Sequence, residues 1–125
     1  MNGTVLIVDD SLTVRMDLSD AFSSAGFRVQ PCGTARDALE ILGRNALDVV
    51  VLDVLLPDGN GVDLLKEVRA SALNGRAIVL MLSSEAEVKD RVRALSKGAD
   101  EYVGKPYDSS YVIAKARELL RARGS

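Results

Sequence analysis

The chain carries the run Val49-Val50-Val51-Leu52-Asp53, which is apolar throughout until it ends in a carboxylate. A continuous Val and Leu run, without alternation of apolar and polar residues, is typical of a strand buried on both faces of a parallel sheet. Open α/β sheets bind their ligands at the carboxyl ends of such strands. The run therefore predicts a parallel α/β fold with an acidic side chain at the ligand-binding edge.

Three other short apolar runs also end in polar side chains. They are residues 5–8 before Asp9 and Asp10, residues 78–82 before Ser83, and residues 102–104 before Lys105. If all four runs are neighbouring parallel strands, their polar ends emerge at one edge of one sheet. The sequence therefore predicts a single site built from Asp53 and these four side chains.

Helical spacing fills the stretches between the runs, and suitable caps mark the helix ends. The N-cap candidates are Ser11 or Asp10, Thr34 and Asp108, and the closing glycines are Gly26, Gly43 and Gly98. Residues 27–30 fit a short second strand, residues 56–61 are rich in turn residues, residues 87–97 fit a helix, and the last helix extends to about Arg121. This alternation predicts one α/β domain over residues 1–125, with a doubly wound, parallel, five-stranded sheet.

The composition is that of an ordinary globular protein, with 47% apolar and 27% charged residues. The net charge of −2 argues against nucleic-acid binding, which needs clustered Lys and Arg. The basic residues of the last helix fit a helix end that complements its dipole better than a binding arm.

No run approaches the roughly 18 apolar residues of a membrane span, and we expect no signal peptide. The single cysteine, Cys32, is most simply a small buried residue, and it favours a reducing, cytoplasmic location.

Three carboxylates at one sheet edge would repel each other. Two like charges about 4 Å apart cost roughly 4 kcal/mol at an effective dielectric of about 20, so Asp9, Asp10 and Asp53 must take up protons or hold a cation. Hard oxygen ligands without Cys or His select Mg²⁺ or Mn²⁺. A carboxylate beside Mg²⁺ is suited to accept a phosphoryl group as an acyl phosphate. Taken alone each acid has a simpler alternative, since Asp9 or Asp10 could cap a helix and Asp53 could form a turn.

Ser83 and Lys105 would hold the oxygens of an arriving phosphoryl group, through a hydroxyl donor and a compact positive charge. Either residue alone at a strand end would be unremarkable, so their weight lies in the set. The dipeptide Lys105-Pro106 also favours a cis bond, a fixed turn that could aim the lysine inward. Because the chain has no histidine, the phosphoryl donor must be another molecule or another domain.

Six short segments stand in an order and spacing that are specific as a set, although each is weak alone. They are Val8-Asp9-Asp10, Leu52-Asp53, Pro57-Asp58-Gly59-Asn60-Gly61, Leu82-Ser83-Ser84, Gly98-Ala99-Asp100-Glu101-Tyr102 and Lys105-Pro106. In this set, over its full length, the chain resembles receiver domains of the two-component response-regulator family, including the single-domain chemotaxis regulator.

The resemblance implies a flavodoxin-like fold with strand order 2-1-3-4-5 and a receiver core over about residues 4–121. It makes Asp53 the acceptor of a phosphoryl group from a histidine kinase or a histidine phosphotransfer domain. Asp10, Asp53 and the backbone carbonyl of Leu55 would bind Mg²⁺ directly, and Asp9 would act through a water. The implied function is a phosphoacceptor signalling switch rather than a turnover enzyme, although such a domain promotes its own phosphorylation and slow dephosphorylation.

The resemblance also implies how the switch responds. Lys105 would hold one phosphoryl oxygen, Ser83 would move to bind another, and the ring of Tyr102 would turn inward. The simpler alternative is that Tyr102 is a half-exposed strand tyrosine. Ser83 stands where Thr is frequent, and because serine leaves χ1 freer we expect looser coupling to Tyr102.

Residues that flank the phosphate site depart from the commonest family pattern. Ser84 stands where Ala is frequent, so its hydroxyl could alter access to the phosphate. Leu55 and Glu85 flank the entrance, and in this family such positions set the rate of dephosphorylation. We expect the apolar Leu55 to hinder the attacking water.

The resemblance places the output surface on the helix over residues 87–97, the strand before Lys105 and the last helix. Tyr102 and Tyr111 belong to this surface, where an exposed Tyr111 is either an interface anchor or an ordinary surface residue. The implied partners are a downstream protein or output domain, and a homodimer through this surface is a further hypothesis. Direct contact with nucleic acid or with a membrane is not expected.

Two other functions fit part of the pattern. A Mg²⁺-dependent phosphatase or phosphotransferase of the haloacid-dehalogenase type also uses a strand-end Asp nucleophile. It needs a second acid two residues later, where this chain has Leu55, and it usually carries a cap domain. A degenerate receiver used only for binding is the other alternative, and the complete set of acidic, Ser and Lys residues argues against it.

Overall fold

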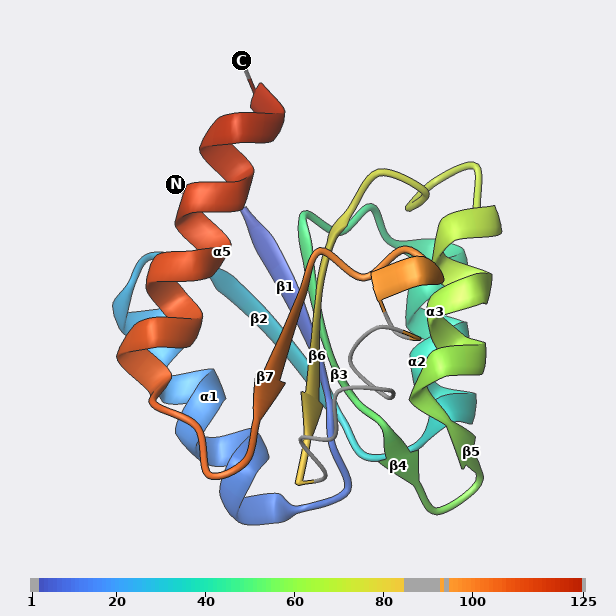
Figure 1. The fold of residues 1–125 in the computed structure, drawn as a ribbon, viewed down its shortest axis with the longest axis horizontal. Coiled ribbons are helices and arrows are strands. Elements are labelled where there is room, and N and C mark those ends of the chain that lie inside the picture. Colours follow the sequence, from blue (N-terminus) through green and yellow to red (C-terminus); the bar gives the residue numbers. More distant parts are fainter. Residues whose placement is uncertain (1–2, 85–92, 94, 125) are drawn as a thin grey trace.

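A five-stranded parallel sheet forms the centre of the molecule, in the order β2-β1-β3-β6-β7 (Figure 1). The computed structural model describes residues 3–84, 93 and 95–124. The five strands are β1 (Thr4–Val8), β2 (Arg28–Cys32), β3 (Val49–Asp53), β6 (Ile78–Ser83) and β7 (Glu101–Gly104). Counted along the chain, their order is 2-1-3-4-5, so the predicted α/β topology is confirmed.

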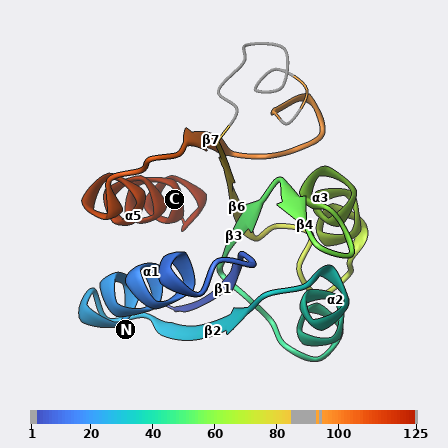
Figure 2. The same cartoon turned by 90° about the horizontal axis from the view of Figure 1, so that it is seen from below.

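Helices cover both faces of the sheet. The end-on view in Figure 2 has α1 (Leu12–Ser24) and α5 (Ser109–Gly124) on one face, and α2 (Ala35–Arg44) and α3 (Gly61–Ala70) on the other. Each pair of helices packs on the sheet over its own apolar cluster. Because both faces are covered, the central strands β3 and β6 are buried at every residue, which explains their continuous apolar sequences.

The strand register aligns the polar ends of the strands at one edge. Val8 pairs with Leu52, Asp53 pairs with Leu82, and Ser83 pairs with Gly104. Asp9 and Lys105 are therefore the first residues after their strands, beside Asp53 and Ser83. The predicted meeting of these side chains at the carboxyl edge is confirmed.

Most of the predicted caps are present. Ser11, rather than Asp10, caps α1 by accepting a hydrogen bond from the backbone N–H of Val14. Thr34 caps α2 in the same way, and Asp108 accepts from the N–H of Ser110 at the start of α5. Gly26 has φ of +93°, as expected of a glycine that closes a helix. Gly98 has φ of +112°, while the helix predicted over residues 87–97 lies mostly outside the described residues.

The prediction that Gly43 closes the second helix is wrong. Helix α2 continues to Arg44, because the backbone N–H and the side-chain amide of Asn45 both donate to the carbonyl of Ile41 and end the helix there. The second strand also lies later than predicted, at Arg28–Cys32. Its predicted first residue, Phe27, instead packs edge-to-face on Phe22, with ring centroids 5.1 Å apart.

Two apolar residues of the first helix are exposed, and the last helix is longer than predicted. Leu12 and Met16 are 61% and 58% exposed. They lie on the outer side of α1, whose buried residues are Leu18 and Phe22. The last helix continues beyond the predicted end to Gly124, since the guanidinium of Arg123 contacts the carboxylate of Asp48 at 3.2 Å.

A buried asparagine holds the opposite edge of the sheet together. Asn74 accepts a hydrogen bond from the backbone N–H of Leu47 and donates to the carbonyls of Leu42 and Asn45. It is 1% exposed, so these bonds replace contacts with water. The loop before β3, the end of α2 and the loop after α3 are therefore joined by one side chain.

Cys32 is buried, as predicted, and burial raises the pKa of its thiol to about 11. No helix within the described part of the chain is long and apolar enough to cross a membrane.

Candidate functional site

Three carboxylates converge at the carboxyl edge of the sheet. Asp9, Asp10 and Asp53 each offer an oxygen atom, and these atoms all lie within 4.8 Å of one another. Asp9 and Asp53 are buried, while Asp10 is exposed at the rim. One side of the acidic cluster thus faces the core and the other is open to an arriving ligand.

Lys105 reaches into this cluster from the end of β7. Its Nζ lies 2.8 Å from Oδ2 of Asp9 and 3.4 Å from Oδ2 of Asp53. Its backbone N–H donates to the carbonyl of Ser83, which fixes the start of the segment after β7 to the neighbouring strand. The Lys105–Pro106 peptide bond is cis, as predicted.

The surroundings of the cluster raise the pKa values of both Asp53 and Lys105. Burial raises the pKa of the Asp53 carboxyl, the charge of Asp9 raises it further, and Lys105 opposes both without cancelling them. Burial alone would lower the pKa of Lys105, but its contacts with Asp9 and Asp53 outweigh this effect and raise it. A positive charge added beside Asp53 would favour its ionised form.

Hydrogen bonds hold Asp9 at three groups, its side-chain carboxylate, its backbone N–H and its backbone carbonyl. Its Oδ1 accepts from the N–H of Ser11 at 2.9 Å, and its own N–H donates to the carbonyl of Cys32. Its carbonyl accepts from Nη1 of Arg15 at 2.7 Å. A Cβ on Gly33 would lie 2.7 Å from that same nitrogen, so a glycine leaves room for the Arg15 guanidinium.

The segment after Asp53 folds back over it. Leu55 donates its N–H to Oδ1 of Asp53 at 3.3 Å, and β4 (Leu55–Leu56) forms a short hairpin with β5 (Gly59–Asn60). Gly61 then starts α3, where a Cβ would collide with the carbonyl oxygen of Asp53. Gly61 is therefore required by a close approach of two backbones rather than by a turn alone.

Asp58, at the tip of this hairpin, binds the start of α2. Its two carboxylate oxygens accept from the N–H groups of Ala35, at 2.8 Å, and Arg36, at 3.1 Å. These hydrogen bonds hold the pKa of the Asp58 carboxyl below its ordinary value. The hairpin that follows Asp53 is thus clamped to a helix on the same face of the sheet.

The remaining predicted site residues have different exposures. Ser83 ends β6 and is buried, whereas Ser84 and Leu55 are exposed beside the site, Leu55 with 63% of its surface accessible. Glu85, predicted to flank the entrance, lies outside the described residues.

The two tyrosines of the predicted output surface differ in burial. Tyr102 is 8% exposed and packs in the cluster shared with α3, so the alternative of a half-exposed strand tyrosine is wrong. Its inward turn in response to Ser83 stays a prediction. Tyr111 is 47% exposed, and its hydroxyl donates to Oε2 of Glu101 at 3.0 Å.

The donor set fits a divalent cation. Three carboxylates with one exposed member provide hard oxygen ligands and leave an open side, which suits Mg²⁺ or Mn²⁺. In addition, the ammonium of Lys105 already contacts the carboxylate oxygens of Asp9 and Asp53. The arrangement can therefore hold a cation, a phosphoryl group and a nucleophilic carboxylate next to each other.

Sequence reasoning missed several residues that support this site. The capping of α2 by Asp58 and the contact between Arg15 and Asp9 join parts that are separate in the chain. Gly61 was recognised only as part of a turn-rich segment, although the sequence Asn60-Gly61 before a helical pattern was an available signal. The positions of the apolar runs in the sequence were sufficient to locate the carboxylates, but they did not indicate these contacts.

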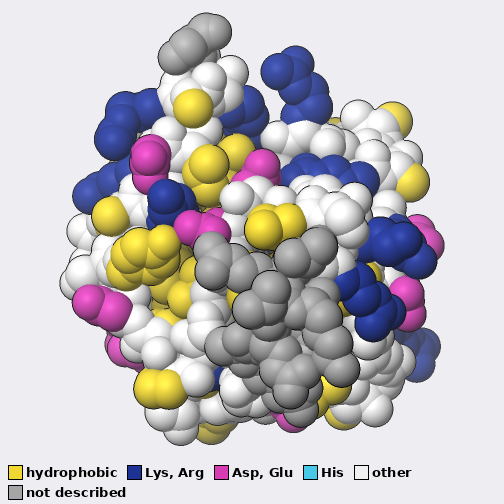
Figure 3. All heavy atoms as spheres, viewed as in Figure 1, with side chains coloured by type: hydrophobic (Ala, Val, Ile, Leu, Met, Phe, Trp, Pro, Cys, Tyr) yellow, Lys and Arg dark blue, Asp and Glu magenta, His cyan; other side chains and the backbone are white. Residues whose placement is uncertain are grey.

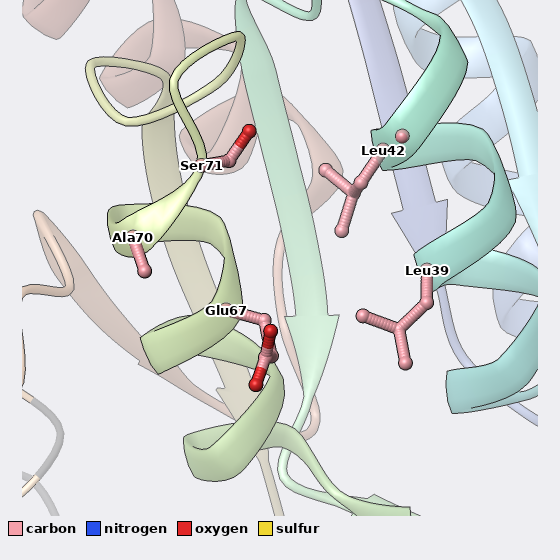
Figure 4. A pocket seen from close by; sticks show the side chains of 6 residues that line it. Leu39, Leu42, Glu67, Ala70 and Ser71 are labelled. Atoms are coloured by element: carbon pink, nitrogen blue, oxygen red, sulfur yellow. The ribbon is translucent and has the colours of Figure 1, made fainter.

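A separate cavity of about 210 Å³ lies between α2 and α3 (Figure 4). Leu39 and Leu42 of α2 face Glu67 and Ala70 of α3 across it. None of the carboxylates of the cluster lines this cavity, so the cavity is separate from the acidic site.

Comparisons with known proteins agree with this geometry. A family model for the response regulator receiver domain matches residues 5–117. The chain belongs to the response regulator receiver domain family. As a receiver domain it is a signalling domain of two-component systems.

Curated relatives of this receiver domain are bacterial regulators. The chain is 38% identical over 121 residues to "Probable transcriptional regulatory protein TcrX" of Mycobacterium tuberculosis, covering 97% of this chain and 51% of the relative. It is 36% identical to the transcriptional activator protein PfeR of Pseudomonas aeruginosa, covering 94% of this chain and 37% of the relative. The chain thus spans about half or less of the length of these relatives.

Solved receiver structures share the fold. The receiver domain of the Francisella response regulator 1452 is 26% identical and superposes with a TM-score of 0.88 over 98% of this chain and 99% of its own. The chemotaxis response regulator CheY4 of Vibrio cholerae is 27% identical, with a TM-score of 0.86 over 92% of this chain and 96% of its own. The predicted resemblance to the chemotaxis regulator is confirmed at the level of fold and family.

Proposed function

We propose that this receiver domain is a phosphoacceptor switch in which Asp53 accepts a phosphoryl group in a Mg²⁺-dependent reaction. The observation that carries the proposal is the position of Lys105, whose ammonium lies 2.8 Å from Asp9 and 3.4 Å from Asp53. A cation among the acids and a phosphoryl group on Asp53 would each replace one of these two contacts. The receiver core is proposed to extend over about residues 4–121.

In the transfer step a carboxylate oxygen of Asp53 attacks the phosphorus of the donor. The new bond joins that oxygen to phosphorus, and the bond from phosphorus to the donor's leaving atom breaks. For a phosphohistidine donor that atom is an imidazole nitrogen, which keeps the electron pair. The product is an acyl phosphate on Asp53. Hydrolysis later restores the free carboxylate, because water attacks the phosphorus, the bond from phosphorus to the Asp53 oxygen breaks, and inorganic phosphate is released.

Asp10, Asp53 and the backbone carbonyl of Leu55 would hold the cation directly, with Asp9 contributing through a water. When bound, Mg²⁺ would neutralise charge on the phosphoryl oxygens and on the acids. Asp9 is fixed for this role by Ser11 and Arg15. Asp53, whose pKa is raised by burial and by Asp9, would remain ionised as a nucleophile beside the added positive charge.

Lys105 and Ser83 would hold the transferred group. The ammonium of Lys105 would leave Asp9 and contact one phosphoryl oxygen, and the hydroxyl of Ser83 would contact another. Movement of Ser83 would then be passed to Tyr102 and to the predicted output surface, of which the structure describes β7 and α5. Such a response is a two-state element biased by a new charge.

The proposed donor is a histidine kinase or a histidine phosphotransfer domain, and we propose a cytoplasmic location for the exchange. The surface next to the acidic cluster carries three exposed apolar side chains, Leu12, Met16 and Leu55. We propose that the phosphoryl donor docks on these side chains. The proposed receiver of the signal is an output domain or a downstream protein. A homodimer through the surface that carries Tyr111 is a further proposal.

Charge placement favours protein partners over nucleic acid. On the face seen in Figure 3, Lys and Arg side chains lie in several separate groups, with Asp and Glu side chains between some of them. A phosphate backbone is bound best by a continuous basic patch. The haloacid-dehalogenase alternative is not supported, since the position of its second acid is held by the exposed Leu55.

Intact mass after incubation with acetyl phosphate and Mg²⁺ tests the proposal. The wild-type protein should gain one phosphoryl group, and both chelation of Mg²⁺ and the Asp53→Asn substitution should prevent the gain. An unmodified wild-type protein, folded and supplied with metal, would contradict the proposed function.

A further inference from the structure

A hydrogen bond between Tyr107 and Asp17 joins the two segments that carry most of the phosphate site. The hydroxyl of Tyr107 donates to Oδ2 of Asp17 at 2.6 Å. Tyr107 lies two residues after Lys105, in the segment between β7 and α5. Asp17 lies on α1, the helix that directly follows Asp9 and Asp10. The bond therefore connects the lysine side of the site to its acidic side.

Tyr107 is anchored well enough to act as such a connection. Its ring packs against the apolar cluster between the sheet and the helices α1 and α5. Burial raises the pKa of its hydroxyl, and the hydrogen bond to Asp17 raises it further, so the hydroxyl remains a donor. Asp17 itself is exposed on α1, which leaves its carboxylate available as an acceptor at the end of the ring.

Two side-chain bridges thus link the same pair of segments. The inner bridge is the ion pair between Lys105 and Asp9, at 2.8 Å, and the outer bridge is the hydrogen bond between Tyr107 and Asp17. In the proposed transfer Lys105 leaves Asp9 to contact the phosphoryl group. The inner bridge is therefore broken during the step in which Lys105 must be held near Asp53. The outer bridge uses no atom of the reaction, so the transfer itself does not break it.

We propose that Tyr107 is a positioning residue, whose hydrogen bond to Asp17 holds the segment after β7 against α1 and keeps Lys105 within reach of the phosphoryl group on Asp53. This inference rests on the proposed function and deepens it. Tyr107 does not touch the phosphoryl group and acts through Lys105 alone. Its loss should slow transfer without changing how the acids hold the cation.

The test compares initial rates of phosphorylation by acetyl phosphate at fixed Mg²⁺. The variants are Tyr107→Phe, Asp17→Ala, Asp17→Asn and the double variant of Tyr107→Phe with Asp17→Ala. The matched control is Arg117→Ala, which removes another bridge from α5, the 2.9 Å bond from Arg117 to the carbonyl of Ala25, the residue that follows α1 at its end away from Lys105. The Mg²⁺ affinity of each variant is measured in parallel from the metal-dependent rise in its thermal midpoint.

Tyr107→Phe and Asp17→Ala should each lower the rate by about threefold to tenfold, the effect of losing one ordinary, solvent-exposed hydrogen bond. The double variant should lose no more than either single one, because both remove the same bond. Asp17→Asn keeps an acceptor oxygen and should recover most of the rate. The Mg²⁺ affinity should not change in any of these variants, and Arg117→Ala should phosphorylate at the wild-type rate.

Wild-type rates in both single variants, losses that multiply in the double variant, or an equal loss of Mg²⁺ affinity would overturn the inference. In each of these cases the wild-type protein is itself phosphorylated, so the proposed function stands. If the wild-type protein accepts no phosphoryl group, the proposed function fails and the inference fails with it.

Discussion

The ammonium group of Lys105 lies 2.8 Å from Oδ2 of Asp9, a residue 96 positions earlier in the chain. The same group also reaches Asp53, so it neutralises part of the carboxylate cluster from within. A divalent cation held by these acids would add positive charge beside the two carboxylates that Lys105 contacts, and would weaken their attraction for its ammonium. Binding of the cation is therefore expected to ease the movement of Lys105 towards a phosphoryl group.

Magnesium should stabilise the folded protein by binding to this acidic cluster. At a concentration of about 100 times Kd, Mg²⁺ should raise the free energy of unfolding by about 2.7 kcal/mol. The Asp10→Asn substitution removes the exposed carboxylate of the cluster and should abolish most of this gain, with little effect on the metal-free protein. Thermal unfolding across a Mg²⁺ titration measures both quantities. An equal gain in the two proteins would mean that the metal binds elsewhere.

The close approach of Gly61 to Asp53 predicts a strong effect of a single methyl group. Gly61→Ala places a Cβ against the carbonyl oxygen of Asp53, so α3 and the end of β3 must move apart. We expect a loss of about 1–3 kcal/mol in the free energy of unfolding, together with slower phosphorylation. Urea unfolding and intact mass after acetyl phosphate treatment measure the two effects.

Gly43→Ala is the matched control for that substitution. A Cβ on Gly43 meets nothing within 4 Å, and this glycine lies inside α2. Replacing a glycine within a helix by alanine should stabilise the protein by about 0.5–1 kcal/mol. If Gly43→Ala destabilised the protein as much as Gly61→Ala, the contact with Asp53 would not explain the effect.

Asn74 should be a major contributor to stability although it is far from the site. Asn74→Ala leaves the buried N–H of Leu47 and the carbonyl of Leu42 without their partner, at a cost of about 1–3 kcal/mol. Asn45→Ala removes a less buried amide and should cost less. Denaturant unfolding of the two variants gives the comparison, and an equal or smaller loss for Asn74→Ala would contradict the role of this network.

The clamp between Asp58 and α2 predicts a dependence of stability on pH. Backbone N–H groups of Ala35 and Arg36 lower the pKa of the folded Asp58 carboxyl below its unfolded value. Its contribution is therefore fully present above the unfolded pKa of about 4 and is lost as the pH falls through the lower folded pKa. The stability difference between wild-type and Asp58→Asn should be constant above that range and should shrink below it. A difference that stayed constant down to the lowest pH at which the protein folds would exclude the clamp.

The sequence was sufficient to predict the sheet and the acidic cluster for a physical reason. Strands buried on both faces need continuous apolar runs, and a parallel register brings their ends together. Asp9, Asp53, Ser83 and Lys105 could therefore be located without coordinates. The burial of Tyr102 could not, because it depends on how a helix face packs over the strand.

The supporting contacts were not predictable from local patterns. Asp58 looked like an ordinary turn residue, and its binding to the N-terminus of α2 becomes visible only when the two segments are packed. The bond from Tyr107 to Asp17 joins residues 90 positions apart, and no local sequence pattern around either residue indicates that the two meet. Gly43 had the expected residue type for a helix end, but Asn45 supplied better hydrogen bonds two residues later.

Chemical trapping of the phosphorylated residue identifies the side chain that accepts the phosphoryl group. Borohydride reduces an aspartyl phosphate to homoserine, so the protein is treated with acetyl phosphate and Mg²⁺, reduced, digested and sequenced by mass spectrometry. We expect homoserine at position 53 in the wild-type protein, and none in a sample from which Mg²⁺ was chelated. An intact Asp53 with homoserine at Asp9 or Asp10, or with no homoserine anywhere, would contradict the proposed function.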